Sequence, residues 1–520
     1  MSLNPNSGRD YVNGYNAKTL TEQVHMYPKF FCGIKFETFR HIQNLTVEFI
    51  NPITVISGSN KSGKTSILLA IACSHYNFYK RDYSNATLKR TTWGDVMKFT
   101  NYDEQQRDWT YYVSYRNGTS CINDKRGQRK FASRKWNGVA KKESQIGTPS
   151  NNSRNTGREV YFIDLDRILP ARKLSLSTYK NARNNNINSL QNTDIITEYV
   201  SYILERQYRV GILYANADNE VFGYENAGYK YSSYNTASGE DVLTRIIEDI
   251  VNAENNSLIL IEEIEIGLHP KIQRRLMDVL YFESHRAHKQ FIVTTHFSSI
   301  LASVSPESRI FIENTNNIFR AIPKISINAA LTKMDSLSYP LIDIYVEDDV
   351  SKDIVKKAVD CINVDRPGFC RIVNIVIIGS ADKTYNYFKT RSQLYDKDTV
   401  NTGYACILDG DMRLERSSSG GLKYPEENLL FFHYSNESPE KMLLKAYIDA
   451  NPNDILQYHY KESNSHCLFE KMVNEGICVG KKEAFELCWN ALIATQEGQQ
   501  YVENLKRFIK EACLKFSADL

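Results

Sequence analysis

The sequence predicts an α/β protein with more than one domain, and three patterns support this prediction. An apolar run at 53–57 leads through a glycine-containing loop into an apolar helical segment. Helix-like and buried-strand patterns alternate from 238 to 300, and a second unit of this kind runs from 341 to 411. A chain of 520 residues is also too long for a single compact core.

The composition excludes several classes of protein. With 42% hydrophobic and 24% charged residues, the chain is neither disordered nor fibrous. No apolar run approaches the roughly 20 residues that cross a bilayer, so we expect no membrane contact. Ten cysteines without a C-x-x-C pair favour reduced thiols and a cytoplasmic location. The polar segment 1–29 is predicted to be a flexible leader rather than a signal peptide.

The strongest motif is a phosphate-binding loop that matches G-x-x-x-x-G-K-[ST] between a predicted strand and a predicted helix. Its glycines allow backbone N–H groups to surround a phosphate, while a lysine and a hydroxyl serve the β/γ-phosphates and Mg²⁺. The motif therefore predicts ATP and Mg²⁺ as cofactors. The expected nucleotide-binding residues are Gly58, Ser59, Asn60, Lys61, Ser62, Gly63, Lys64, Thr65 and Ser66, with Thr65 also on the metal.

Downstream, the apolar run 258–261 ends in Glu262 and Glu263. A strand ending in two carboxylates can present a metal ligand and a base that orients water. We predict Glu262 near the Mg²⁺, although aspartate is usual at this position and the longer side chain leaves its contact open. Glu263 is the expected base; a solvated acidic strand end is the alternative.

Two further motifs indicate the type of P-loop protein. Ser238, Gly239 and Glu240 open a predicted helix before the Glu262 strand, and His296 ends a strand after it. This order resembles the ABC-type ATPase head, and the segment 34–49 before the P-loop looks like the SMC and RecF branch. The resemblance implies that Ser238–Glu240 cap the γ-phosphate of a partner subunit, which implies a homodimer or higher homo-oligomer. It also makes His296 the switch histidine, while Gln105 and Gln106 are candidates for the Q-loop glutamine.

A second acidic site is predicted after 341. Glu347 follows one apolar strand, and Asp409 and Asp411 follow another in a D-x-D pattern. Alternate residues of a strand face the same side, so the three carboxylates can share a hard cation and, with it, form a site for in-line attack on a phosphodiester. Acidic caps on parallel strands are the alternative.

This order of elements resembles a Toprim domain, and an ABC-type head followed by Toprim resembles the OLD (overcoming lysogenisation defect) nuclease family. The implied domains are an ATPase at 30–325 with an insertion at about 124–215, Toprim at 335–450, and a helical C-terminal extension at 451–520. The implied metal ligands are Glu347, Asp409, Asp411 and Glu440, with Glu437 as the alternative to Glu440. Many Toprim strands end in Glu-Gly, whereas here Asp348 and Asp349 follow Glu347, which adds negative charge and leaves the ligand set open.

The segment 125–142 is basic and carries two aromatic side chains, which suits a nucleic-acid surface, with a solvated loop as the alternative. Its members are Lys125, Arg126, Arg129, Lys130, Phe131, Arg134, Lys135, Trp136, Lys141 and Lys142.

The resemblance implies an ATP-hydrolysing, Mg²⁺-dependent nuclease acting on DNA in anti-phage defence, with Mn²⁺ possible at the Toprim site. One alternative is an ATP-switched sensor or scaffold with a silent Toprim fold that acts through a partner. Another is an effector that cleaves RNA, including tRNA. The resemblance also implies a second defence component, either a protein or a retron reverse transcriptase with its RNA and DNA.

Overall fold

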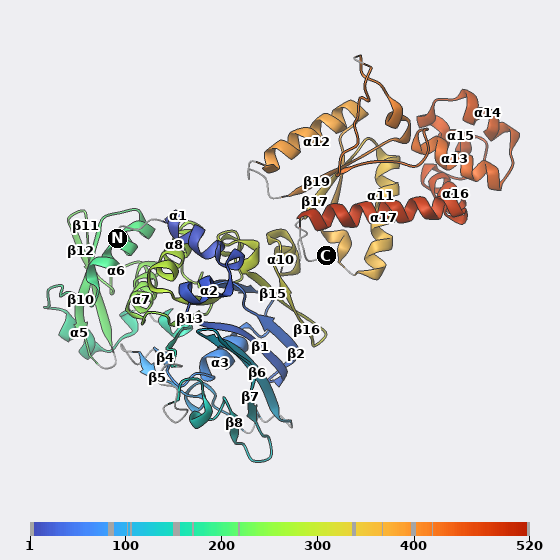
Figure 1. Ribbon diagram of the computed structural model, residues 1–520. Coiled ribbons are helices and arrows are strands. Elements are labelled where there is room, and N and C mark those ends of the chain that lie inside the picture. Colours follow the sequence, from blue (N-terminus) through green and yellow to red (C-terminus); the bar gives the residue numbers. More distant parts are fainter. Residues whose placement is uncertain are drawn as a thin grey trace. The chain divides into compact units, whose positions relative to one another are not determined.

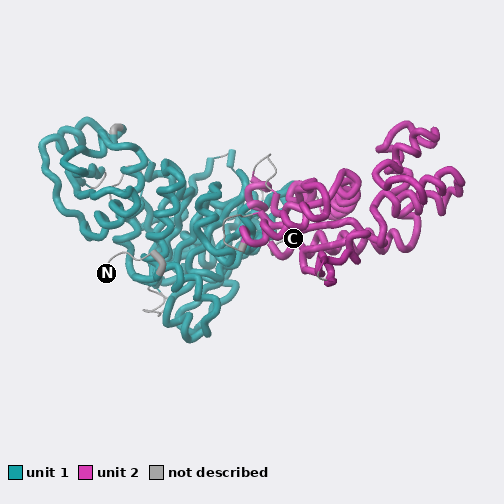
Figure 2. Tube along the Cα trace, turned by 90° about the horizontal axis from the view of Figure 1, so that it is seen from above, with its two compact units in different colours: residues 1–327 teal, residues 328–520 magenta. Residues whose placement is uncertain are grey.

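The computed structural model of the chain divides into two compact units, Met1–Ile327 and Asn328–Leu520 (Figures 1 and 2). The structure describes residues 5–81, 88–100, 102–103, 107–148, 157–168, 171–216, 219–334, 340–366, 368–396, 402–418 and 420–516. In these ranges, no helix is both long enough and apolar enough to span a membrane. The predicted α/β class is confirmed in both units.

Unit 1 is built on an eight-stranded mixed sheet whose inner strands are parallel (Figure 1). Its central strands carry only buried residues, as expected when both faces of a sheet are covered. In spatial order the strands are β16 (Ile318–Pro323), β15 (Arg309–Thr315), β3 (Ile53–Ser57), β14 (Gln290–Thr294), β13 (Leu258–Ile261), β9 (Val160–Ile163), β4 (Phe78–Lys80) and β5 (Lys89–Arg90).

A second, antiparallel sheet covers the helix that follows the P-loop. That helix, α3 (Lys64–Cys73), is buried from Ser66 to Cys73 and shares one apolar core with both sheets. The antiparallel strands are, in order, β2 (Ile42–Glu48), β1 (Lys29–Phe39), β6 (Trp109–Asn117), β7 (Ser120–Arg129) and β8 (Trp136–Gly138). After α3, unit 1 contains the helices α4 (Trp93–Val96), α5 (Leu176–Ala182), α6 (Thr193–Leu204), α7 (Ser238–Asn252), α8 (Pro270–Ala287) and α9 (Ser298–Leu301).

The predicted insertion at 124–215 is not a single insertion. β7 and β8 extend the antiparallel sheet, and β9 pairs in parallel with β13 at the centre of the main sheet. The sequence did not predict these strands, because the residues around them are polar and β7 is an exposed strand with few buried side chains. A separate three-stranded sheet follows, formed by β10 (Tyr208–Ala215), β11 (Glu220–Asn226) and β12 (Tyr229–Ser232).

The predicted flexible leader is instead folded over its described residues. It forms α1 (Pro5–Asn13) and α2 (Leu20–Met26), and Val12, Tyr15 and Tyr27 are buried. Arg9 donates to Ser303 O at 2.8 Å and to Asp278 Oδ1 at 2.6 Å. A few aromatic side chains thus anchor a segment whose polar composition predicted flexibility.

Unit 2 contains a four-stranded parallel sheet in the order β18 (Val373–Ile377), β17 (Ile342–Val346), β19 (Gly403–Leu408) and β20 (Leu430–Phe432). From β17 the chain crosses to β18 and then returns past β17 to β19. Right-handed crossovers in opposite directions place α11 (Asp349–Asp365) and α12 (Ala381–Asp396) on opposite faces. The carboxyl ends of β17 and β19 therefore flank the point where the strand order reverses, where open α/β sheets bind ligands.

The C-terminal part of unit 2 is helical, as predicted. Its last helix also belongs to the core, because the Phe516 ring lies 5.3 Å from the Tyr404 ring on β19. The helices are α13 (Pro439–Ala450), α14 (Asp454–Glu462), α15 (Leu468–Asn474), α16 (Lys481–Ala494) and α17 (Gln496–Phe516), while α10 (Ile327–Met334) precedes the sheet.

Candidate nucleotide and metal sites

The P-loop joins β3 to α3 in a conformation that requires glycine. A Cβ on Gly58 would lie 2.5 Å from Ile312 O, and one on Gly63 would lie 2.7 Å from Ile42 Cδ1. Gly63 also has a φ of +96°, which L side chains rarely adopt. Both glycines of the motif are therefore fixed by close packing as well as by backbone conformation.

Lys64 lies buried along this loop. Its Nζ donates to Gly58 O at 2.8 Å and to Ser59 O at 3.1 Å. Burial lowers the pKa of Lys64 to about 8, while Glu263, Glu265 and Glu262 oppose that shift. The loop thus holds a cation beside a group of carboxylates.

Glu262 meets the P-loop directly. The Thr65 hydroxyl donates a hydrogen bond to Glu262 Oε1, so the longer glutamate side chain reaches the residue that the sequence placed on Mg²⁺. Burial raises the pKa of Glu262. A hydroxyl and a carboxylate in contact are oxygen donors of the type that Mg²⁺ prefers, so these two residues fit the ion.

Glu263 and His296 lie together at the ends of neighbouring parallel strands. Glu263 Oε1 is 3.9 Å from His296 Nε2. Glu263 has a φ of +43°, a left-handed conformation that is rare for glutamate, and its backbone N–H donates to Thr294 Oγ1 at 2.9 Å. Such strained conformations gather at functional sites. Burial, followed by Lys64, lowers the pKa of His296 and favours its neutral form.

Sequence reasoning missed Glu265. This side chain is 4% exposed and accepts a hydrogen bond from the His296 backbone N–H at 2.7 Å. Its other oxygen has no hydrogen-bond partner in the described part of the chain, and burial raises its pKa. The repeated glutamate in the segment I-E-E-I-E was the available signal.

Ser238, Gly239 and Glu240, which were expected to cap the γ-phosphate of a partner subunit, have different environments at the start of α7. Ser238 is exposed at the first turn, and a Cβ on Gly239 would lie 2.6 Å from Gly267 O. Glu240 instead accepts a hydrogen bond from Tyr208 Oη at 2.6 Å within the same chain. The Glu240 carboxylate is therefore engaged by Tyr208 of the β10–β12 sheet and is not available to contact a phosphate. The Q-loop candidates Gln105 and Gln106 lie outside the described residues.

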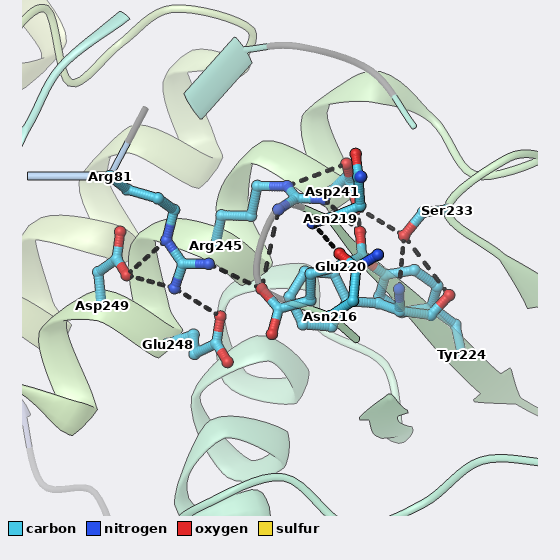
Figure 3. Close-up of polar contacts among 11 residues, drawn as sticks. Arg81, Asn216, Asn219, Glu220, Tyr224, Ser233, Asp241, Arg245, Glu248 and Asp249 are labelled. Atoms are coloured by element: carbon cyan, nitrogen blue, oxygen red, sulfur yellow. Dashed lines mark hydrogen bonds and ion pairs between the residues drawn. The ribbon is translucent and has the colours of Figure 1, made fainter. Parts of the chain in front are cut away.

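Further along α7, a buried charge network links three distant segments (Figure 3). Arg81 follows β4, and its guanidinium lies 2.7 Å from Glu220 Oε2 on β11, 3.2 Å from Glu248 Oε2 and 2.7 Å from Asp249 Oδ1. The neighbouring Arg245 contacts Glu220 and Asp241. Among the residues drawn, two guanidinium groups thus face four carboxylates, and burial raises the pKa of Glu248 to about 8.

In unit 2, the three predicted carboxylates line one pocket of about 550 Å³ at the carboxyl ends of β17 and β19. The Asp409 backbone N–H donates to Glu347 Oε1 at 2.8 Å, and Ser351 Oγ donates to Asp409 Oδ1 at 2.8 Å. Asp411 lies on the exposed side of the same pocket. The structure thus brings Glu347, Asp409 and Asp411 together.

Burial raises the pKa values of Glu347, Asp409 and Asp411. After burial, the Glu347 carboxylate raises the pKa of Asp409, and the Asp411 carboxylate raises the pKa of Glu347. Lys423, which lines the same pocket, already lies 3.0 Å from both Asp382 and Glu415. Clustered oxygen donors with an unfavourable charge balance fit a divalent cation.

Close backbone packing leaves no room for a side chain at Gly410, between the two aspartates. A Cβ on Gly410 would lie 2.3 Å from Ser435 O and 3.0 Å from His433 O. The segment after β20 therefore runs directly against the D-G-D turn and holds Asp409 and Asp411 at the pocket.

The two candidates for the fourth ligand differ clearly. Tyr460 Oη donates to both carboxylate oxygens of Glu437, at 2.7 and 2.8 Å, which directs Glu437 toward α14. Glu440 is 2% exposed, raises the pKa of Asp409, and accepts from His466 Nδ1 at 2.9 Å. Asp348 caps α11 by accepting from Ser351 N at 2.8 Å and also lines the pocket.

The predicted nucleic-acid loop is corrected in part. Trp136 stacks on Trp93 with ring centroids 4.4 Å apart, and Arg129 lies 4.1 Å above the Phe99 ring. These contacts tie both side chains to the antiparallel sheet, and one face of the half-buried Trp136 ring is taken by Trp93. Lys130, Lys135 and Lys141 are exposed on this edge of the sheet.

One sequence-family model matches part of unit 1. Residues 113–302 match a sequence family described as "AAA domain, putative AbiEii toxin, Type IV TA system". This span includes Ser238, Glu263 and His296, and it begins after the P-loop. No curated protein matches the sequence. The match covers less than half of the chain, and together with the P-loop motif at 58–65 it supports a P-loop ATPase assignment for unit 1.

Several solved structures are similar to part of the chain. The SMC head domain from Thermotoga maritima is 12% identical, with a TM-score of 0.36, and the match covers 56% of this chain and 98% of that chain. The Smc head domain from Pyrococcus furiosus bound to the C-terminal domain of ScpA is 11% identical, with a TM-score of 0.39, covering 56% and 96%. The recombination mediator protein RecF is 10% identical, with a TM-score of 0.33, covering 57% and 98%.

Proposed function

We propose that this chain is an ATP-regulated, metal-dependent nuclease in which unit 1 hydrolyses ATP and unit 2 cleaves a phosphodiester. One observation carries the proposal: Glu347, Asp409 and Asp411 line a single pocket where the strand order of a parallel sheet reverses. The expected resemblance to Toprim and OLD nucleases is consistent with this arrangement, and DNA is the favoured substrate.

In unit 1, each proposed role follows from a contact. Lys64 is the cation for the β/γ-phosphates, and Thr65 with Glu262 holds Mg²⁺. Glu263 orients the attacking water, and His296 contacts the γ-phosphate from the neighbouring strand. Glu265 positions His296 through its backbone N–H.

In unit 2, Glu347, Asp409 and Asp411 would hold the divalent cation, Mg²⁺ or Mn²⁺. When bound, the cation would polarise the phosphodiester and lower the pKa of a water molecule. Ser351 orients Asp409 by its hydrogen bond, and the Asp409 backbone N–H orients Glu347. The close packing of Gly410 keeps both aspartates on the pocket side of the turn.

The exposed Ser238 at the start of α7 supports a composite ATP site, in which this residue caps the nucleotide of a second copy. We therefore propose a homodimer formed through unit 1. Anti-phage defence is the proposed setting, with a protein or retron component as a further partner.

The test is a cleavage assay on plasmid, linear DNA and total RNA with Mg²⁺ or Mn²⁺, with and without ATP. We expect cation-dependent cleavage of DNA that is lost in Asp411→Asn. Asp449→Asn is the matched control, because Asp449 is an exposed aspartate on α13 outside the pocket. Cleavage of RNA alone would favour the RNA effector, and equal cleavage by Asp411→Asn and the parent would contradict the proposed site.

A further inference from the structure

We infer that unit 1 has a buried binding site for a halide ion, with chloride as the natural occupant, lined by Lys29, Arg116 and Arg158. These residues come from β1, from β6 and from the segment just before β9, and all three line one small cavity. The cavity has a volume of about 10 Å³, which is about what a single water-sized particle requires. A polyatomic anion such as phosphate is therefore too large for it.

Positive charge is concentrated around this cavity, and the described residues that line it include no carboxylate. Arg116 and Arg158 are each only 5% exposed. The other lining residues carry aromatic, aliphatic, amide or imidazole side chains. Burial lowers the pKa of the imidazole, which belongs to His75, to about 3, so this ring is neutral. The lining therefore carries cationic groups without a balancing negative charge.

Within the described part of the chain, the hydrogen bonds of Arg158 go to neutral acceptors. Its guanidinium donates to Gln290 Oε1 at 2.8 Å and to the backbone oxygens of Asn256 and Ser257, at 2.9 and 3.1 Å. Burial lowers the pKa of Arg158 to about 9, and the Arg116 charge adds to this shift. These neighbouring cations therefore repel each other, and an anion in the cavity that they share would offset this cost.

Arg116 has a donor that is not used. Its Nη2 donates to Tyr15 Oη at 3.1 Å and to Tyr27 O at 3.0 Å, which ties the N-terminal segment to β6. Its Nε is buried and has no hydrogen-bond partner among the described residues. The Phe30 ring lies 5.5 Å from Arg116 Cζ, but a neutral ring compensates a buried charge only in part. The unused donor is thus independent evidence that the described residues leave this cation incompletely compensated.

The acidic side chains near these cations do not supply the missing charge at the cavity. Burial raises the pKa of the Cys32 thiol and of the Tyr15 phenol, so both groups are neutral at pH 7 although Arg116 opposes both shifts. The Glu159 carboxylate raises the pKa of Lys29, but it accepts a hydrogen bond from Tyr161 Oη at 2.5 Å and does not line the cavity. We therefore expect the negative charge to come from solution.

This inference does not depend on the proposed function, so the full chain can be tested without an activity assay. Thermal unfolding is measured in mixtures of sodium chloride and sodium gluconate at constant ionic strength, because gluconate is too large for the cavity. An anion that binds the folded chain alone raises its stability as its concentration increases. We expect the midpoint to rise by about 2 °C for each tenfold increase in chloride. A midpoint that does not depend on chloride would overturn the inference.

Arg116→Met should lose the chloride dependence, because it removes one of the buried charges at the cavity. Lys29→Met is a second variant, since Arg116 also holds the N-terminal segment and its loss can impair folding. Lys35→Met is the matched control, because Lys35 is an exposed lysine on the same strand as Lys29. The control should respond to chloride as the parent does. A full chloride response in Lys29→Met would overturn the inference, whether or not Arg116→Met folds.

Bromide locates the site directly, because it can replace chloride and scatters X-rays anomalously. A crystal of the full chain soaked in sodium bromide should show an anomalous peak in the cavity beside Arg116 and Arg158. An empty or water-filled cavity, in a crystal whose surface sites hold bromide, would overturn the inference.

Discussion

The P-loop site and the carboxylate pocket both place acids directly after buried parallel strands, but they balance that charge differently. In unit 1, Lys64 lies among Glu262, Glu263 and Glu265, and each glutamate raises its pKa. In unit 2, Lys423 is the lysine that lines the pocket, and it is already paired with Asp382 and Glu415.

This difference shows what each site needs from outside the protein. A site with its own lysine is complementary to a polyanion such as a triphosphate. A site of mutually repelling carboxylates needs a divalent cation before it can approach a phosphodiester. The same strand-end geometry therefore supports a nucleotide site in one unit and a metal site in the other.

The largest expected effect is the loss of ATP hydrolysis when the charge of Lys64 is removed. Lys64→Met should reduce ATP hydrolysis by about a thousandfold, because the side chain that neutralises the β/γ-phosphates is lost. Phosphate release measures this loss. Lys180→Met is the control, since Lys180 is an exposed lysine on α5, outside the P-loop. An equal loss in both variants would mean that the effect does not come from the Lys64 charge at the nucleotide.

Glu263→Gln should reduce hydrolysis by about a hundredfold while ATP binding persists, because the amide cannot accept a proton from water. Bound ATP should then hold two copies together, which size-exclusion chromatography with ATP can detect. Unchanged turnover would remove Glu263 as the base. A variant that loses hydrolysis but stays monomeric with ATP would contradict the composite site.

The network around Arg81 extends the comparison, because there two guanidinium groups of the chain itself face four carboxylates. Arg81→Met should destabilise unit 1 by about 3 kcal/mol, since it leaves buried carboxylates unpaired. Urea unfolding measures the change. Arg209→Met is the control, because Arg209 is 66% exposed and lies 3.5 Å from Glu225. Equal effects of the two variants would show that burial does not determine how much these ion pairs contribute to the free energy of unfolding.

A smaller effect concerns pH. Burial and then Glu220 raise the pKa of Glu248 from 4.5 to about 8, so the folded protein holds a proton that the unfolded chain releases. The stability contributed by this protonation is complete below about pH 4.5 and is lost as the pH rises through about 8. Glu248→Gln does not titrate. The midpoint of its thermal unfolding should therefore rise relative to that of the parent as the pH increases from 4.5 through about 8. A constant difference across this range would contradict the raised pKa.

The sequence predicted those features that depend on local spacing. The P-loop, the strand ending at Glu262 and the D-G-D turn each follow from a few adjacent residues, and the α/β class follows from strand and helix periods. Glu347 and Asp409 could be paired because parallel strands end at one edge of a sheet.

Features that depend on tertiary contacts were missed. β9 lies in a polar stretch that resembled an insertion, yet it pairs beside β13. The leader is held by aromatic side chains whose partners lie far away in the sequence, such as Tyr27 with Ser284 at 2.8 Å. His466 gave no local signal, because a lone histidine between helices has many possible roles and only the fold brings it to Glu440.

The most direct test of two chemically separate sites is to measure ATP hydrolysis and nucleic-acid cleavage on the same preparation of Asp409→Asn. Asparagine keeps the size of Asp409 and can still accept from Ser351, but it removes the charge that would hold the cation. We predict that cleavage falls by about a hundredfold or more while ATP hydrolysis stays within about twofold of the parent. Cleavage equal to that of the parent would contradict the metal site, and parallel loss of both activities would contradict the separation of the two.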